Sequence, residues 1–109
     1  MAEFIKGDIV VVPFPFSDLS GNKKRPALVL ADLAGDDIIL CQITSQQSKD
    51  IYAIPLNSAD FKNGSLPIDS NIRPTRIFTA DKNIIIRKAG TVNVSVMTSV
   101  SKVLEAIFK

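Results

Sequence analysis

The chain contains no histidine and a single cysteine among its 109 residues. Without histidine, acid–base catalysis by imidazole is excluded. One isolated cysteine also leaves no standard set of zinc ligands, and we expect no metal or other cofactor. Cys41 cannot form an internal disulfide, and its place in the apolar run IILCQI predicts a small buried core residue in a reducing, cytoplasmic protein.

Long hydrophobic runs and a strong charge imbalance are also missing. No stretch of about 18 apolar residues occurs, and no basic segment precedes an apolar one, so we expect a soluble protein with no membrane partner. The formal net charge is only +2, from 13 basic and 11 acidic side chains. Any polyanion must therefore be met by local clusters of cations. The apolar share of 46% predicts one globular domain over residues 1–109.

Short apolar and β-branched runs, separated by turn residues, predict five to seven strands. The expected strands and extended segments are residues 9–12, 26–32, 38–44, 51–56, 65–68, 70–80 and 83–92. Pro13 is expected to end the first strand, Pro74 to mark an edge or bulge, and Gly90 to end the last strand. The second and third strands are expected to form an antiparallel hairpin around the turn 34–37.

The remaining segments predict one long loop and two helical pieces. Residues 13–24 form a loop of about 12 residues, a length that is often functional. Ser58 is expected to cap a short helical turn over 59–62. From Asn93 or Ser95 a 3.6-residue period predicts a C-terminal helix of about 14 residues, with an apolar stripe formed by Val96, Val100, Val103, Leu104 and Ile107. The expected fold is mainly β, a small, strongly curved antiparallel barrel with a packing C-terminal helix.

The first candidate cluster is the basic run before the second strand. Pro26 keeps Arg25 out of the helical region, so the guanidinium is held at a strand end. A planar guanidinium suits phosphate oxygens, and Lys23 and Lys24 add local positive charge. A solvated turn before a strand is the alternative interpretation of the same residues.

The second candidate cluster follows the third strand. In an antiparallel hairpin the start of one strand lies beside the end of the other, so Arg25 and Thr44 are expected at the same end of the sheet. The hydroxyl, amide and ammonium groups of Ser45, Gln46 and Lys49 could bind a phosphodiester and a base edge. Polar strand exits are also common in ordinary turns.

Further candidates are two arginines and a loop phenylalanine. Arg73 and Arg76 are three residues apart in an extended segment, which predicts opposite faces and at most one of them at any site. Phe16, which with Phe14 flanks Pro15, could stack on a base. Phenylalanines in loops more often fold back to seal a barrel end, and we favour that interpretation.

Four blocks, in this order and spacing, resemble the MazF/PemK family of toxins from type II toxin–antitoxin modules. They are KGDIVVVPFPF, KKRPALVLA, ITSQQSK and KAGTVNVSVMTSVSKVLEAIF, which together span nearly the whole chain. The resemblance implies an SH3-like barrel with a C-terminal helix, a homodimer, a cognate antitoxin, and metal-independent cleavage of single-stranded RNA.

The resemblance also assigns roles. Arg25 matches the catalytic arginine and Thr44 the catalytic hydroxyl residue of the family. The implied reaction is attack by a ribose 2′-hydroxyl that leaves a 2′,3′-cyclic phosphate and a 5′-hydroxyl, and its general base is left open. Expected RNA-binding residues are Lys23, Lys24, Ser45, Gln46, Lys49, Arg73, Arg76 and Phe16.

One block departs from the family pattern. Arg76 and Phe78 stand where better-known members carry a glutamine and a cation. This departure is expected either in a PemK-like branch that recognises a different RNA sequence or in a homologue that has lost activity. The alternative function is a non-catalytic member that binds RNA or a protein target, since CcdB-type gyrase poisons share the fold.

Overall fold

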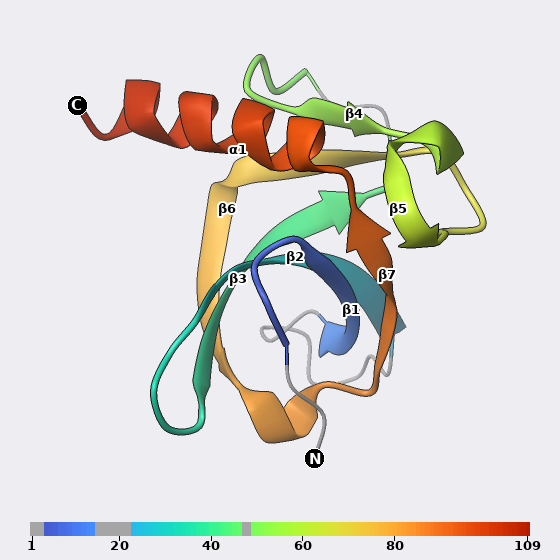
Figure 1. Cartoon of the computed structure of the whole chain (residues 1–109), viewed down its shortest axis with the longest axis vertical. Helices are drawn as coiled ribbons and strands as arrows, with labels where there is room; N and C mark the ends of the chain where they lie inside the picture. The colour runs from blue at the N-terminus through green and yellow to red at the C-terminus, as the bar shows by residue number, and fades with distance from the viewer. Residues whose placement is uncertain (1–3, 15–22, 47–48) are drawn as a thin grey trace.

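Seven antiparallel strands form one strongly curled sheet in the part of the chain that the structure describes, residues 4–14, 23–46 and 49–109 (Figure 1). In this computed structural model the strand order is β4-β6-β3-β2-β1-β7-β5. The elements are β1 (Asp8–Phe14), β2 (Lys23–Asp32), β3 (Asp37–Thr44), β4 (Ile54–Leu56), η1 (Ser58–Asp60), β5 (Phe61–Gly64), β6 (Ser70–Asp81), η2 (Lys82–Ile84), β7 (Arg87–Val92) and α1 (Val94–Ile107). This half-barrel with a packing helix confirms the fold class expected from the sequence.

Two hydrophobic cores lie on the two faces of the central strands, because successive side chains of a strand point to opposite faces. On β1, for example, Ile9 enters the first core and Val10 the second. The first core is shared with α1 and contains Ile9, Leu28, Cys41, Ile43, Leu56, Ile72, Val92, Val96 and Val100. The second core contains Phe4, Val10, Val12, Ala27, Val29, Ile38, Leu40 and Ala80.

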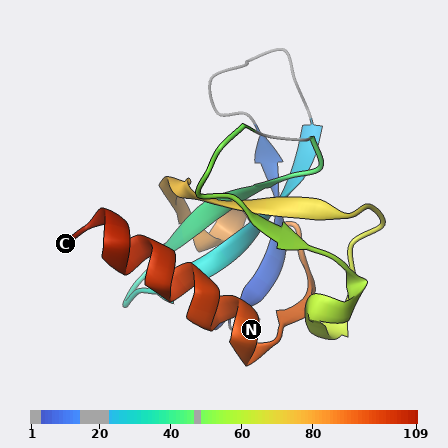
Figure 2. The ribbon, with the colours of Figure 1, turned by 90° about the horizontal axis from the view of Figure 1, so that it is seen from above.

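The C-terminal helix matches its prediction in both length and orientation. It has 14 residues, follows the N-cap Asn93, and buries Val96 and Val100 of the expected stripe. Figure 2 shows α1 lying along one side of the curled sheet. Among the described residues, no helix is long and apolar enough to cross a membrane.

Both prolines near the basic run lie inside strands, which corrects two expected boundaries. β1 continues through Pro13 to Phe14, and β2 begins at Lys23, three residues before Pro26. β7 pairs with β1 no further than Val11, so Pro13 lies where β1 has β2 as its only neighbour. The missing amide hydrogen of a proline is tolerated at such an edge.

The β4–β5 region also differs from its prediction. β4 is shorter than expected because Ala53 N donates to Asp50 O (3.1 Å) in a turn that occupies residues 50–53. Asn57 caps η1 in place of Ser58, since its side chain accepts from Ala59 N. The next strand is β5, so residues 65–68 are not a strand as expected.

Of the two longest expected segments, the one that became β7 had two wrong boundaries, and the one that became β6 had a correctly predicted bulge. Residues 83–86 precede β7, because Asp81 caps η2 by accepting from Asn83 N (2.8 Å), and Gly90 lies inside β7 instead of ending it. On β6 the register against β3 changes between Arg73 and Ile77, which confirms a bulge at Pro74.

Candidate functional site

Arg25 and Thr44 lie at the same end of the β2–β3 hairpin, as the sequence predicted. The pairs Ala27–Gln42 and Leu28–Cys41 fix the register of the two strands. Carried two residues further, the same register puts Arg25 level with Thr44, and neighbouring antiparallel strands have facing Cα atoms about 5 Å apart. Strand alternation places Arg25 and Thr44 on the face of the second core, with Ala27, whereas Ile43, next to Thr44, belongs to the first core.

The Arg25 side chain is half-buried and carries an unsatisfied donor. Its Nε is buried, and no acceptor for it is present among the described residues. Leaving a buried donor without a partner costs about 1–3 kcal/mol, and more when the group is charged. An anionic oxygen placed against the guanidinium would supply the missing acceptor.

The Thr44 side chain is buried, with 8% of the residue exposed. Its Oγ1 accepts a hydrogen bond from Gln46 N at 3.2 Å. A hydroxyl has one hydrogen to donate besides its acceptor lone pairs. Because the backbone of Gln46 uses an acceptor position, the hydroxyl hydrogen of Thr44 remains able to donate to an incoming oxygen.

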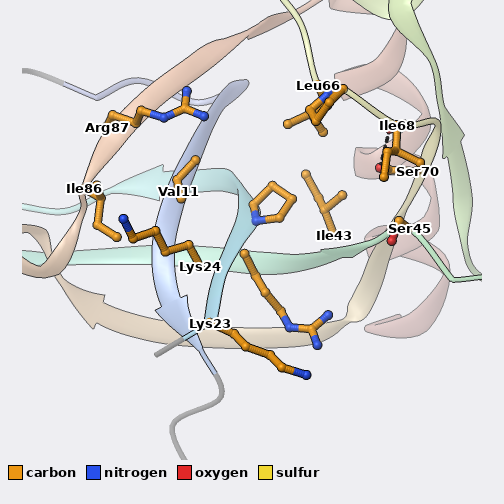
Figure 3. Close-up of a pocket in the computed structure, with 13 residues that line it drawn as sticks. Val11, Lys23, Lys24, Ile43, Ser45, Leu66, Ile68, Ser70, Ile86 and Arg87 are labelled. Atoms are coloured by element: carbon orange, nitrogen blue, oxygen red, sulfur yellow. Dashed lines mark hydrogen bonds between the residues drawn. The ribbon is translucent and has the colours of Figure 1, made fainter. Parts of the chain in front are cut away.

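A groove of about 680 Å³ opens on the face that carries Ile43, and Arg25 is part of its lining (Figure 3). Its floor follows a row of cross-strand neighbours, since Val11 pairs with both Pro26 and Arg87. Lys24 extends toward Ile86 on one side of the groove, and Leu66, Ile68 and Ser70 lie on the other (Figure 3). The lining residues are Val11, Lys23, Lys24, Arg25, Pro26, Ile43, Ser45, Leu66, Pro67, Ile68, Ser70, Ile86 and Arg87.

The groove unites four of the residues singled out from the sequence: Lys23, Lys24, Arg25 and Ser45. Thr44 is not part of the lining, although the adjacent Ser45 is. Both lysines are exposed, and none of the ion pairs between described residues involves them. The result is a concave surface with an apolar floor and cations along its edge, which suits an anionic ligand that also has apolar parts.

The groove also contains residues that the sequence analysis missed. Arg87 is an exposed cation at the start of β7, and the apolar Leu66 and Ile68 come from the segment between β5 and β6. Only the antiparallel pairing of β7 with β1, which includes the Val11–Arg87 pair, brings β7 beside the β1–β2 strands. The sequence carries no local signal of that pairing.

The other predicted RNA-binding residues lie outside the groove lining. Arg73 forms an ion pair with Asp50 (Nε to Oδ2, 3.3 Å), while Arg76 is exposed in the β6 bulge. Gln46 and Lys49 are exposed beyond the end of β3. Phe16 lies outside the described residues.

Asp50, which no sequence pattern had singled out, accepts hydrogen bonds from three groups of the described residues. Its carboxylate accepts from Tyr52 N (2.9 Å), Arg73 Nε and Thr75 Oγ1 (both 3.3 Å). The hydrogen bond from Tyr52 N, followed by those from Arg73 and Thr75, holds the pKa of Asp50 below its usual value against the opposing effect of desolvation. Asp50 is therefore ionised at neutral pH.

Cys41 lies in the first core, as expected. Burial raises the pKa of its thiol to about 12. The reactive thiolate form is thus negligible at neutral pH, and Cys41 acts as a core side chain and not as a nucleophile.

A sequence model described as a PemK-like, MazF-like toxin of type II toxin–antitoxin systems matches residues 5–108. No curated protein sequence matches the chain. Several solved structures share the fold. A MazE–MazF complex from Deinococcus radiodurans has a TM-score of 0.75 and 18% identity, with 94% of each chain covered.

Two mycobacterial structures give similar values. An endoribonuclease in complex with its cognate antitoxin has a TM-score of 0.72 and 16% identity, covering 97% of this chain and 93% of that one. The Mycobacterium tuberculosis toxin MazF-mt6 has a TM-score of 0.73 and 15% identity, covering 93% of this chain and 95% of that one.

Proposed function

Since the chain belongs to the PemK-like, MazF-like family of toxins from type II toxin–antitoxin systems, we propose that it is an endoribonuclease that cleaves single-stranded RNA without a metal ion. The observation that carries the proposal is the buried Nε of Arg25, which has no acceptor in the described part of the chain and lies beside a groove edged with cations. A phosphodiester oxygen is the acceptor that this guanidinium lacks. Thr44, level with Arg25 on the next strand, offers a second donor.

The proposed reaction is an internal transfer at one phosphodiester. The ribose 2′-oxygen bonds to the adjacent phosphorus, and its proton passes to a base. The bond from phosphorus to the 5′-oxygen breaks, and that oxygen takes a proton and leaves as a 5′-hydroxyl, while the phosphate stays on the other fragment as a 2′,3′-cyclic ester.

Arg25 and Thr44 act on the charge that builds up on the phosphoryl oxygens. The guanidinium donates hydrogen bonds to these oxygens, and the Thr44 hydroxyl adds another donor. Removing one such donor typically raises the barrier by about 3 kcal/mol, which is on the order of a hundredfold in rate. Lys23, Lys24 and Arg87 attract the flanking phosphates along the edge of the groove.

The proposed regulator is a cognate antitoxin with an acidic, partly apolar segment. Solved relatives include a MazE–MazF complex and an endoribonuclease bound to its cognate antitoxin. In this chain the apolar floor formed by Val11, Pro26 and Ile43 suits large apolar side chains, and the cations at its edge suit carboxylates. Such a segment would cover Arg25 and exclude RNA.

A homodimer is proposed as the working assembly. Ile51, Val94 and Phe108 are large apolar side chains with most of their surface exposed, and contact with a second copy would remove such surface from water. Light scattering at micromolar concentration should give twice the chain mass of 11.8 kDa. A monomer under these conditions would contradict this part of the proposal.

The activity is tested by incubating purified protein with single-stranded RNA in EDTA. Wild type should cut the RNA, and the new 5′ ends should accept phosphate from polynucleotide kinase without prior phosphatase treatment. Arg25→Ala should lower the cleavage rate on the order of a hundredfold or more. Lys102→Ala, which removes an exposed cation on α1, is the matched control and should cut like wild type.

Two results would overturn the nuclease assignment. One is the absence of cleavage by wild type, and the other is equal cleavage by Arg25→Ala. Binding of RNA that weakens with salt but leads to no cleavage would point to the non-catalytic alternative.

A further inference from the structure

The segment that follows Thr44 is tied to β6 at two places. Asn71 Nδ2 donates to Gln46 O at 3.5 Å, just past the end of β3. Further along, Asp50 accepts from Arg73 and Thr75, both at 3.3 Å. The donors are alternate residues of β6, so the start of that strand holds both described ends of the β3–β4 segment, residues 45–46 and 49–53.

The contact at Asp50 is sheltered from solvent. Its side chain is 9% exposed, and that of Arg73 is 22% exposed. Ion pairs in such surroundings are screened less than surface pairs, and removing one partner leaves a poorly solvated charge behind. The bond from Tyr52 N to Asp50 also closes the turn that leads into β4. Asp50 therefore joins β6, the turn and the segment after Thr44.

This arrangement bears directly on the candidate site. The β3–β4 segment starts at Thr44, whose Oγ1 is held by Gln46 N, and Ser45 lines the groove. We propose that Asp50 is a positioning residue which, through Arg73 and Thr75, fixes the segment so that Thr44 and Ser45 are correctly placed for the phosphodiester. The inference rests on the proposed RNA cleavage, and Asp50 itself contacts no reacting atom.

The proposal gives Arg73 a different role from the one expected from sequence. As an RNA-binding cation, Arg73 would act through its charge, and its neighbour Asp50 would repel RNA. Removing the Asp50 carboxylate would then strengthen RNA binding and leave cleavage intact. If the pair positions the segment, removing either partner should slow cleavage. The two roles therefore make different predictions for Asp50→Ala. A direct RNA contact by Arg73 predicts tighter binding with unchanged cleavage, and a positioning role predicts slower cleavage.

The experiment compares wild type with Asp50→Ala, Arg73→Ala and the double variant. Single-turnover cleavage is measured at saturating RNA, and affinity is measured at several salt concentrations with an oligonucleotide carrying 2′-deoxyribose at the mapped cut position. Each single variant should cut about tenfold or more slowly, and the double variant should be no slower than the slower single variant, because residues in one network are not additive. Arg73→Lys, which keeps the ion pair, should recover most of the rate.

A matched control separates positioning from direct charge effects. Arg76→Ala removes the same charge from the same strand, but Arg76 is exposed in the bulge. The variant therefore measures the effect of losing one positive charge without losing the Arg73–Asp50 ion pair. Arg73→Ala should leave the slope of log affinity against log salt at the wild-type value. A slope reduced by about 1, with additive effects of Asp50 and Arg73, would overturn the proposal. The proposal would also be overturned if Asp50→Ala cut RNA at the wild-type rate and bound it more tightly.

A second readout does not depend on activity. Asp50→Ala should speed hydrogen exchange of the Gln46 amide, which bonds to Thr44 Oγ1, while amides of α1 keep wild-type exchange and thereby report an intact fold. Unchanged exchange at Gln46 would overturn the positioning role. If wild type cuts no RNA, the proposed function fails, and the exchange result alone decides whether Asp50 orders this segment.

Discussion

Arg25 and Thr44 stand level with each other on neighbouring antiparallel strands, held there by the Ala27–Gln42 and Leu28–Cys41 pairs. A cation whose buried Nε has no acceptor among the described residues and a hydroxyl that accepts from Gln46 N thus lie at one end of the sheet. The groove beside them is edged by Lys23, Lys24 and Arg87.

Replacing Arg25 should separate activity from stability. Arg25→Ala should abolish most cleavage but leave the free energy of unfolding unchanged or slightly higher, because it deletes a buried donor that has no partner. Urea unfolding and single-turnover cleavage on the same preparations check this. A large loss of stability would mean that Arg25 is mainly structural.

The hydroxyl of Thr44 is tested by two substitutions of similar size. Thr44→Val removes the hydroxyl and should slow cleavage on the order of a hundredfold, whereas Thr44→Ser keeps it and should stay within about tenfold of wild type. Equal rates for the two variants would contradict a specific role of the hydroxyl at this position.

The exposed cations of the groove should affect binding more than chemistry. Lys24→Ala and Arg87→Ala should each weaken RNA binding and lower the salt slope by about 1, with little change of rate at saturating RNA. Binding titrations from low to moderate salt measure this. Lys102→Ala on α1 is the control, and an equal loss with that variant would count against a specific RNA path through the groove.

Two glycines with similar backbone angles should differ in their tolerance of alanine. Gly64 (φ 72°) and Gly35 (φ 83°) both have positive φ. A Cβ at Gly64 would clash with the backbone of Ala89 on β7, whereas one at Gly35 would meet nothing within 4 Å. We expect Gly35→Ala to lose about 1–2 kcal/mol of unfolding free energy and Gly64→Ala clearly more. Equal losses by urea unfolding would contradict the close approach of β5 to β7.

The depressed pKa of Asp50 predicts a pH dependence of stability. A carboxyl with a lowered folded-state pKa stabilises the protein above its unfolded pKa of about 3.9, and loses that contribution as pH falls through the folded value. The stability difference between wild type and Asp50→Asn should be constant from about pH 6 to 8 and shrink below about pH 4. A difference that does not change down to pH 3 would contradict the role of the charge.

Local patterns predicted the elements that depend on neighbours in sequence. The 3.6-residue stripe of Val96 and Val100 was sufficient for α1, and the turn between two apolar runs was sufficient for the β2–β3 hairpin. Errors fell where tertiary contacts override local signals. Pro13 and Gly90 were expected to end strands, but each lies within a strand. Pro13 lies where β1 pairs with β2 alone, and Gly90 pairs with both β1 and β5.

For the candidate site, the sequence by itself determined that Arg25 and Thr44 lie at the same end of the β2–β3 hairpin, because a hairpin is a local structure. The register at that end also depends on the bulge between Val29 and Ala31. Tertiary structure alone decided the rest. The pairing of β7 with β1 brings Arg87 to the groove, and β6 brings Arg73 to Asp50 across 23 residues of sequence. Such contacts depend on how distant strands pair, and no residue pattern within a single segment specifies that pairing.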